Sequence, residues 1–509
     1  MPRGNDIYLF LIKSHCNSMK HTNLFITGVL TAMLASCQPS VQAPQPILPV
    51  PQQKQVDWQK METYAFVVFG LNTFNDLEWG YGDTDPMTFN PTKLDCEQWV
   101  KTFVQAGMKG VIFTAKHHDG FCLWPTQLTD NCIRSTPSKD GKGDIVGELA
   151  AACKKYGIKF AVYLSPWDRH QANYAQPEYV DFFHAQLREL MTNYGDVFEV
   201  WFDGANGGDG WYGGAKETRT IDRKTYYDYP KIYLMLDELQ PQTIVFSDGG
   251  PGCRWVGNEK GYAGATNWSF LRAGEVYPGY PNYHELQYGH ADGNQWVAAE
   301  CDVSIRPGWF YHPEEDDRVK TVEQLTDLYY RSVGHNATLL LNFPIDRNGL
   351  VHPIDSANAV NFYKNIQNEL ANNLLAGITP TVSDERGGAY KAKAMTDGNY
   401  DTYWATNDGV VSASMEFTLS KATKVNRMML QEYIPLGQRV KSFTVEYYNG
   451  SKWQPVTLDE ETTTIGYKRL LRFKTVITDK LRVTIDDARA CPTINNVEAY
   501  YADESGAWF

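Results

Sequence analysis

Asp203 stands where a carboxylate could act as a nucleophile. It follows the largely apolar run 197–202 and precedes Gly204. A buried strand that ends in an acid delivers it to a loop mouth, although an Asp-Gly pair also caps ordinary turns. Retaining glycoside hydrolysis needs such a carboxylate and a second, protonated carboxyl group about 5 to 5.5 Å away. Asp203 therefore requires a partner.

Two downstream glutamates could supply that acid. Glu259 lies in the Gly-bounded stretch 254–261, which we place in a loop after the fifth strand, and Glu300 directly precedes the predicted seventh strand. A loop acid at a barrel mouth suits proton donation better than an acid at the start of a strand, so we favour Glu259. Glu300 stays open as the alternative, and either glutamate could instead be a surface or ion-paired residue.

Further polar side chains follow other predicted strands. His117 and His118 come after the strand 110–115 and could ligate a metal or form a structural pair. Neighbours in a strand point to opposite faces, so we prefer hydrogen bonds to substrate hydroxyl groups. Glu78 and Trp79 follow the first strand, where an acid and an indole could bind the hydroxyl groups and the apolar face of a sugar. A solvated turn is the alternative there.

Repeated apolar runs with helical patterns between them must position these residues. Such alternation is typical of a parallel βα protein, and eight runs predict the α/β fold class with a (β/α)₈ barrel. The predicted strands are 65–71, 110–115, 159–164, 198–202, 243–247, about 264–268, 301–305 and 338–342. Helical patterns cover 96–106, 145–156, 178–194 and 226–239. The catalytic domain is expected to span 57–372.

The remainder of the chain has a different pattern. From residue 377 to 509, short alternating strands are separated by turn residues, which predicts an all-β sandwich domain. The net charge of −13, with no basic cluster, argues against a nucleic-acid partner. The nine cysteines form no CxxC pair, so neither a zinc site nor a disulfide scaffold is indicated, and an isolated Cys122–Cys132 bridge stays open.

The N-terminus reads as a targeting segment. From Met19 a basic start and a short apolar stretch lead to Leu34-Ala35-Ser36-Cys37, which resembles a bacterial lipobox with Cys37 as the lipidated residue. The apolar stretch is shorter than the roughly 20 residues that span a bilayer. We therefore expect residues 1–37 to be a signal segment and the Pro/Gln-rich residues 38–56 a tether. A lipid anchor would be the only membrane contact, in the bacterial cell envelope, periplasmic or at the outer membrane.

Several separated motifs together resemble the family 29 glycoside hydrolases, the retaining α-L-fucosidases, over about 58–370. The stretch 114–121 resembles the family's fucose-binding histidine loop, and 201–204 its nucleophile strand. The stretches 72–80 and 254–259 resemble the branch that prefers α-1,3 and α-1,4 linkages, which implies that Asp203 is the nucleophile and Glu259 the acid/base. The resemblance also implies a fucose pocket lined by Tyr163, Trp201, Arg306 and Trp309, and no cofactor for catalysis.

One position departs from the family pattern. Where the family often carries a histidine in the first strand, this chain has Val68, so one hydrogen bond to fucose would be missing. We expect an exo-α-L-fucosidase that acts on fucosylated oligosaccharides. Two alternatives stay open: a catalytically impaired glycan-binding surface lipoprotein, and a retaining glycosidase for a fucose-like sugar such as galactose in the same configuration. The oligomeric state is unknown from sequence.

The C-terminal domain resembles a discoidin, or factor V/VIII type C, module over about 377–499. Asp397, Asn399 and Asp401 resemble its calcium loop, where oxygen ligands suit a hard cation. The resemblance leaves two roles open, glycan binding and structural support of the barrel, because a sandwich fold does not fix function.

Overall fold

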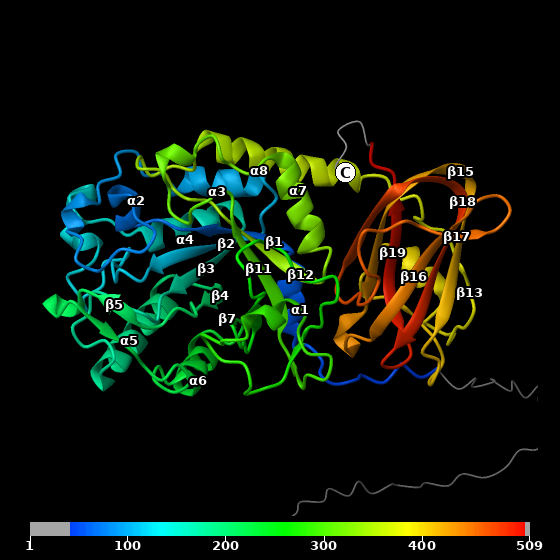
Figure 1. Ribbon diagram of the computed structural model, residues 1–509, viewed down its shortest axis with the longest axis horizontal. Coiled ribbons are helices and arrows are strands. Elements are labelled where there is room, and N and C mark those ends of the chain that lie inside the picture. Colours follow the sequence, from blue (N-terminus) through cyan, green and yellow to red (C-terminus); the bar gives the residue numbers. More distant parts are fainter. Residues whose placement is uncertain (1–40, 504–509) are drawn as a thin grey trace, which may run out of the picture. The chain divides into compact units, whose positions relative to one another are not determined.

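The computed structural model describes residues 41–503, and its first domain is a closed barrel of eight parallel strands (Figure 1). In chain order the barrel strands are β1 (Thr63–Val67), β2 (Gly110–Lys116), β3 (Lys159–Leu164), β4 (Val197–Trp201), β7 (Ile244–Ser247), β8 (Cys253–Trp255), β11 (Ala298–Ser304) and β12 (Ala337–Asn342). Strand β1 closes the barrel by pairing in parallel with both β12 and β2. The predicted (β/α)₈ architecture is confirmed.

One predicted strand is wrong. The sequence predicts a sixth strand near 264–268, but the sixth barrel strand is β8, which pairs with β7 and β11. Strand β8 has only three residues and follows the Gly-Gly-Pro-Gly stretch 249–252, so its apolar run is too short to stand out from a loop. Glu259 consequently lies in the loop after the sixth strand rather than the fifth. Glu300 lies inside β11 rather than before it.

Helices cover the outside of the strands (Figure 1). They are α1 (Gln53–Gln59), α2 (Leu71–Asn75), α3 (Cys96–Gln105), α4 (Ile145–Tyr156), α5 (Pro177–Asn193), α6 (Tyr229–Leu239), α7 (Val322–Arg331) and α8 (Pro353–Glu369). Asp144 caps α4 by accepting a hydrogen bond from Gly147 N at 2.9 Å. Helix α6 begins later than the predicted residue 226 because Asp228 adopts a left-handed conformation, and Pro230 then suits the first helical turn.

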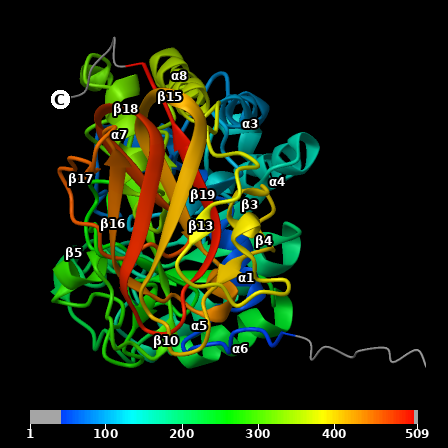
Figure 2. The same cartoon turned by 90° about the vertical axis from the view of Figure 1, so that its right-hand side faces the viewer.

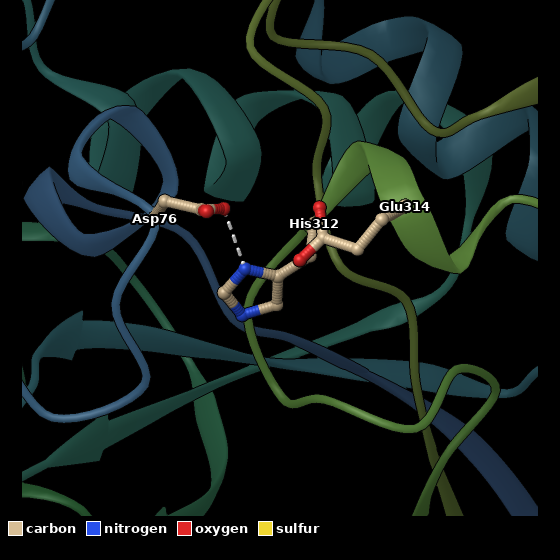
Figure 3. Close-up of side chains that lie close together, drawn as sticks. All are labelled: Asp76, His312 and Glu314. Carbon is tan, nitrogen blue, oxygen red and sulfur yellow. Dashed lines mark hydrogen bonds and ion pairs between the residues drawn. The ribbon is translucent and has the colours of Figure 1, made fainter.

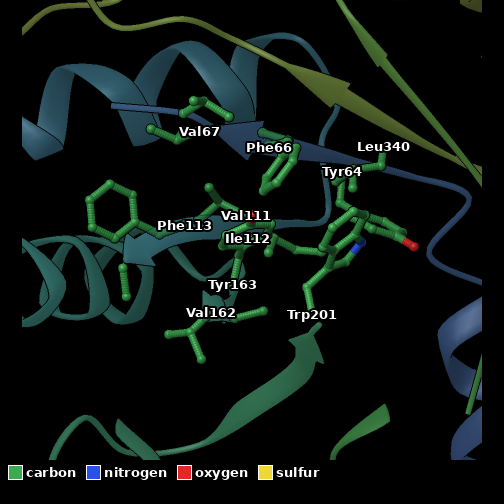
Figure 4. Packing of buried hydrophobic residues seen from close by; sticks show 14 of the residues in the cluster. Tyr64, Phe66, Val67, Val111, Ile112, Phe113, Val162, Tyr163, Trp201 and Leu340 are labelled. Atoms are coloured by element: carbon green, nitrogen blue, oxygen red, sulfur yellow. The ribbon is translucent and has the colours of Figure 1, made fainter. Parts of the chain in front are cut away.

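Aromatic and branched side chains pack on both faces of the barrel strands, inside the barrel and against the helices around it (Figure 4). Trp201 stacks on Phe246 with ring centroids 3.9 Å apart, and Tyr163 stacks on Trp201 at 5.2 Å. Stacked rings of this kind bury large apolar areas and fix one another's orientation. Because Tyr163 and Trp201 belong to β3 and β4, the packing also fixes the strand end at which Asp203 emerges.

The second domain is a seven-stranded, antiparallel sheet structure (Figure 2). Its strands are β13 (Thr381–Val382), β14 (Trp404–Ala405), β15 (Ala413–Glu432), β16 (Val440–Tyr448), β17 (Trp453–Pro455), β18 (Arg469–Ala488) and β19 (Thr493–Tyr500). Met415, Phe417 and Leu419 of β15 are buried while the residues between them are more exposed, as alternation in a strand requires. This confirms the predicted all-β domain. Outside it, β5 (Gly208–Gly210) pairs with β6 (Glu217–Arg219), and β9 (Phe270–Leu271) with β10 (Gln295–Trp296).

The structure describes the predicted tether from residue 41 onward. This part of the tether is hydrogen-bonded to residues of the C-terminal domain. Ile47 N donates a hydrogen bond to the Leu436 carbonyl at 3.0 Å, and Arg489 donates to the Leu48 carbonyl at 2.8 Å. The lipidation prediction at Cys37 lies outside the described residues. Between residues 41 and 503, none of the helices combines the length and apolar character that crossing a bilayer requires.

The cysteines of the described chain are not bridged. All seven that lie within residues 41–503 are free thiols, including Cys122 and Cys132. The backbones of these two residues pair as an isolated bridge, but their side chains are not joined. The disulfide that the sequence left open is therefore not formed in this structure.

Candidate active site

A cavity of about 360 Å³ opens at the carboxyl-terminal ends of the barrel strands. Most of the sequence-predicted site residues line it, namely Trp79, His117, His118, Tyr163, Trp201, Asp203, Glu259 and Trp309. The structure thus brings both predicted catalytic carboxyl groups and both histidines into one cavity.

Asp203 follows β4 and is held by donors on both oxygens. Oδ2 accepts a hydrogen bond from the Tyr163 hydroxyl at 3.0 Å, and Oδ1 accepts one from Ala205 N at 2.7 Å. Burial raises the pKa of Asp203, whereas the hydrogen bonds from the Ala205 amide and the Tyr163 hydroxyl oppose that rise. These donors orient the carboxylate and stabilise its ionised form, which is the form that a nucleophile needs.

The two histidines both face the cavity, contrary to the expectation that neighbours point apart. They follow Lys116, the last residue of β2, where the pleat has ended. His118 Nδ1 lies 2.7 Å from Ser165 Oγ, and His118 Nε2 lies 3.8 Å from Asp203. Burial lowers the pKa of His117 well below its ordinary value and that of His118 to about 3. Neutral imidazoles therefore face the cavity, where they can hydrogen-bond to hydroxyl groups.

Glu259 enters the cavity from the loop after β8. Its Oε2 accepts a hydrogen bond from Trp309 Nε1 at 3.2 Å. Burial raises the pKa of Glu259, the Trp309 bond opposes this, and the charges of Asp203 and Glu78 raise the pKa further. A carboxyl group with a raised pKa retains its proton nearer to neutral pH, as a general acid must.

Glu300, the alternative acid, is sealed inside the barrel. Its exposed fraction is 0%, and it does not line the cavity. Its oxygens accept hydrogen bonds from Trp201 Nε1 at 2.8 Å and from the Tyr64 hydroxyl. Sequence reasoning missed its partner Glu199, whose pKa is raised well above the ordinary value by burial and by the adjacent Glu300. Since substrate cannot reach Glu300, the geometry favours Glu259.

Two residues that were predicted to bind sugar lie outside the cavity wall. The Glu78 carboxylate accepts hydrogen bonds from Trp309 N at 2.9 Å and Phe310 N at 3.1 Å. Arg306 is fully buried and makes two hydrogen bonds of 2.8 Å to the Asp355 carboxylate of α8. A buried guanidinium needs such a partner. Neither side chain lines the cavity in this structure; both hold the loop after β11, and their predicted sugar-binding roles stay predictions.

Sequence reasoning also missed two buried carboxyl groups in the cavity wall, Asp248 and Asp302. Asp302 accepts a hydrogen bond from Trp255 Nε1 at 2.8 Å, and Asp248 accepts one from Gly279 N at 2.7 Å. Burial raises the pKa of Asp248 to about 7 and that of Asp302 well above its ordinary value. The sequence held a signal for Asp302, because it lies two residues after Glu300 in one strand and alternate residues of a strand point to the same face.

The predicted calcium loop brings oxygen atoms of three residues together. Thr402 Oγ1 donates a hydrogen bond to Asp397 Oδ2 at 2.7 Å and lies 3.0 Å from the Asn399 carbonyl. The Asn399 side-chain oxygen instead accepts a hydrogen bond from Asp401 N at 3.1 Å. Carboxylate and carbonyl oxygens are ligands that Ca²⁺ takes, so the Asp397 carboxylate and the Asn399 main-chain carbonyl suit the ion, whereas Asp401 joins this loop through its main-chain amide. The calcium site stays a prediction.

Comparisons with known proteins agree with this geometry. Residues 47–362 match the α-L-fucosidase family and residues 379–497 the F5/8 type C domain. Alpha-L-fucosidase 1 of Arabidopsis thaliana is 39% identical over 476 residues, which cover 91% of this chain and 90% of that protein. A solved glycoside hydrolase 29 family member from an unknown rumen bacterium is 47% identical with a TM-score of 0.82, over 91% of this chain and 79% of that one. A Ruminococcus gnavus GH29 fucosidase in complex with fucose is 33% identical with a TM-score of 0.80, over 91% and 97% respectively.

Proposed function

We propose that this chain, which belongs to the α-L-fucosidase family of glycoside hydrolases, removes terminal α-1,3- and α-1,4-linked fucose with retention of configuration. Asp203 attacks the anomeric carbon while Glu259 protonates the departing glycosidic oxygen, which yields a fucosyl-enzyme and the free leaving group. Glu259, now ionised, takes a proton from a water molecule that attacks the anomeric carbon and releases fucose from Asp203. Two inversions at that carbon give net retention.

The observation that carries this proposal is that the two carboxyl groups in one cavity have different hydrogen-bond donors and neighbouring charges. Asp203 has hydrogen-bond donors on both oxygens, which favour the ionised form. Glu259 has a single donor and stands near the negative charge of Asp203, which favours the protonated form. Divergent environments of this kind separate a nucleophile from a general acid.

The linkage preference has a narrower basis. It rests on the resemblance of the stretches 72–80 and 254–259 to one branch of the family. It is supported by aromatic groups in the cavity wall, where the rings of Trp255 and Tyr283 lie 5.6 Å apart beside the loop of Glu259. Such rings can contact the apolar face of a second sugar in the leaving group.

A second candidate keeps the reaction and changes the sugar. Val68 lines the cavity at the position where the family often has a histidine, so one polar contact is replaced by an apolar one. A glycosidase for a fucose-like sugar therefore remains the alternative. Intact Asp203 and Glu259 count against a protein that only binds glycans.

The direct test compares fucose release from a Lewis-type trisaccharide and from 2'-fucosyllactose. We expect cleavage of the first only, loss of activity in Asp203→Ala and Glu259→Ala, and α-fucose as the first product seen by proton NMR. Release of the β-anomer would refute retention. Cleavage of 2'-fucosyllactose alone would refute the linkage preference, and turnover only of an aryl galactoside of fucose-like configuration would establish the second candidate.

We also propose that the protein is a lipid-anchored envelope protein with Cys37 as the modified residue. The support is the basic, apolar and Leu-Ala-Ser-Cys order of residues 19–37. Mass spectrometry of the protein from a bacterial membrane fraction should find a diacylglyceryl group on Cys37, and Cys37→Ala should move the protein to the soluble fraction. An unmodified Cys37 in the membrane fraction would contradict the proposal.

A calcium ion bound at Asp397 is proposed as a structural element of the C-terminal domain. An ion at a hundredfold excess over its dissociation constant stabilises the folded state by about 2.7 kcal/mol. EDTA should therefore lower the unfolding midpoint of the full chain, and Asp397→Ala should lower it and abolish the EDTA response. An EDTA response that survives in Asp397→Ala would place the ion elsewhere.

A further inference from the structure

We infer that His312 is a positioning residue that holds Trp309, and through it Glu259, in the geometry of catalysis. The inference rests on the proposed function only in taking Glu259 as the acid/base. It arises from a continuous set of contacts that begins outside the cavity wall and ends at Glu259.

The His312 imidazole is bonded to a carboxylate at each nitrogen. Nδ1 lies 2.8 Å from Asp76 Oδ1 (Figure 3), and Nε2 lies 2.7 Å from Glu78 Oε1. A carboxylate oxygen only accepts, so both nitrogens need a proton and the ring is a cation. Burial alone would lower the pKa of His312, but the bonds to Asp76 and Glu78 outweigh it and raise the pKa. Arg347, 3.4 Å from Asp76, and the exposed Glu314 are the other charged groups beside the ring.

Glu78 passes this constraint to the main chain after β11. Its two oxygens accept hydrogen bonds from Trp309 N and Phe310 N, while Oε1 also faces His312. Gly308 permits this close approach, because a Cβ there would lie 2.6 Å from Glu78 Oε1 and 3.0 Å from the imidazole. The His312 imidazolium therefore holds the Glu78 carboxylate where the Trp309 and Phe310 amides donate to it.

Trp309 completes the path to the acid. Its carbonyl accepts a hydrogen bond from Asn342 Nδ2 at 2.9 Å, its ring packs edge-on against Phe66, and its indole donates to Glu259. The main chain of Trp309 is thus held on one side by Glu78 and on the other by Asn342. Release of Glu78 would let the indole leave Glu259.

The experiment is the pH dependence of kcat/KM for a fucosylated oligosaccharide, whose poor leaving group needs the acid. In His312→Gln the ionised form of Glu259 loses its donor and Glu78 loses its counter-ion. Both changes raise the pKa of Glu259, so the alkaline limb should move to higher pH by about half a unit to one unit. Trp309→Phe should move the limb in the same direction, and His312→Gln added to Trp309→Phe should move it clearly less than His312→Gln does alone, because only the unpaired charge of Glu78 is then left to act.

Two further variants keep the test decisive. Asp76 is half exposed, so Asp76→Asn should fold even if His312→Gln does not, and a neutral imidazole there should give a smaller shift in the same direction. His335→Gln is the matched control, because His335 is also buried and lies 2.7 Å from a carboxylate, that of Glu460, but not in the cavity wall. It should leave the limb in place.

The outcomes separate this inference from the proposed function. An unmoved limb in both His312→Gln and Asp76→Asn, or a His312→Gln shift that is as large in the Trp309→Phe background as in the unmutated protein, would overturn the role of His312. Glu259→Gln tests the acid by itself. If that variant keeps full activity and an unchanged alkaline limb, the assignment of Glu259 fails, whatever His312 does.

Discussion

The molecule holds two carboxyl pairs in neighbouring layers of one barrel, and their surroundings differ. Asp203 and Glu259 follow strand ends and line a cavity. Glu199 and Glu300 lie within β4 and β11, with exposed fractions of 0%, under the rings of Trp201 and Tyr64. Both pairs combine two acids in low-dielectric surroundings, yet only the first pair is open to a substrate.

The difference shows what turns an acid pair into a reaction centre. In the inner pair, burial and mutual repulsion retain a proton, and the indoles of Trp58 and Trp201 occupy the remaining oxygens. In the outer pair, Tyr163 and the Ala205 amide orient one carboxylate, and the other has a single donor. Perturbed ionisation is common to both pairs, so access and the placement of donors decide the function.

Replacing the nucleophile should give the largest effect. Asp203→Ala removes the group that attacks the anomeric carbon, so kcat on any fucoside should fall by about 10⁴-fold or more. Added azide should restore turnover and yield fucosyl azide. Glu199→Gln, in the same strand but in the inner pair, is the control and should keep kcat within about tenfold. Equal losses in the two variants would erase the distinction between the pairs.

Glu259→Gln should give the next largest effect, and one that depends on the leaving group. Loss of general acid catalysis should lower kcat/KM about 10²- to 10³-fold for an oligosaccharide. An aryl fucoside, whose leaving group needs little protonation, should lose far less in this step. The alkaline limb of the oligosaccharide profile should disappear. A uniform loss on both substrates would point away from acid catalysis.

Glu300→Ala should act on stability more than on chemistry. It leaves Glu199 without its partner and Trp201 without its acceptor, so we expect the free energy of unfolding to fall by about 3 kcal/mol. Chemical denaturation measures this change, with Glu259→Ala as the comparison on a half-exposed loop. A stable Glu300→Ala variant that has lost all activity would return Glu300 to the list of catalytic acids.

The inner pair should also make stability depend on pH. Burial raises the folded-state pKa of both Glu199 and Glu300, and the neighbouring Glu300 raises that of Glu199 further, so the folded protein keeps a proton that the unfolded chain releases. The contribution is complete below the unfolded carboxyl pKa of about 4.3 and is lost as pH rises from there towards the raised folded value. Glu300→Gln should reduce this slope by up to about 1.4 kcal/mol per pH unit. An unchanged slope would mean that the pair is ionised when folded.

Much of the barrel could be predicted because its signal is local. Apolar runs such as those of β2 and β3 are long enough to mark buried strands, and so is the run of β4, which Asp203 follows. Strand β8 escaped prediction because three residues between a glycine-rich turn and a loop carry too short a pattern. Its neighbours in the sheet, β7 and β11, supply the hydrogen bonds that make it a strand.

The sequence by itself determined the residue types, the order of the strands and the loops that would carry polar groups. Only the tertiary structure decided which of those groups meet. Arg306 and Glu78 come from the expected loops, yet the Arg306 guanidinium pairs with Asp355 and the Glu78 carboxylate accepts a hydrogen bond from the Trp309 amide. A charged group that leaves water needs such a partner. Glu199 and Glu300 are 101 residues apart and look unrelated along the chain. Closure of the barrel places them together, because the inward faces of distant strands share one small interior.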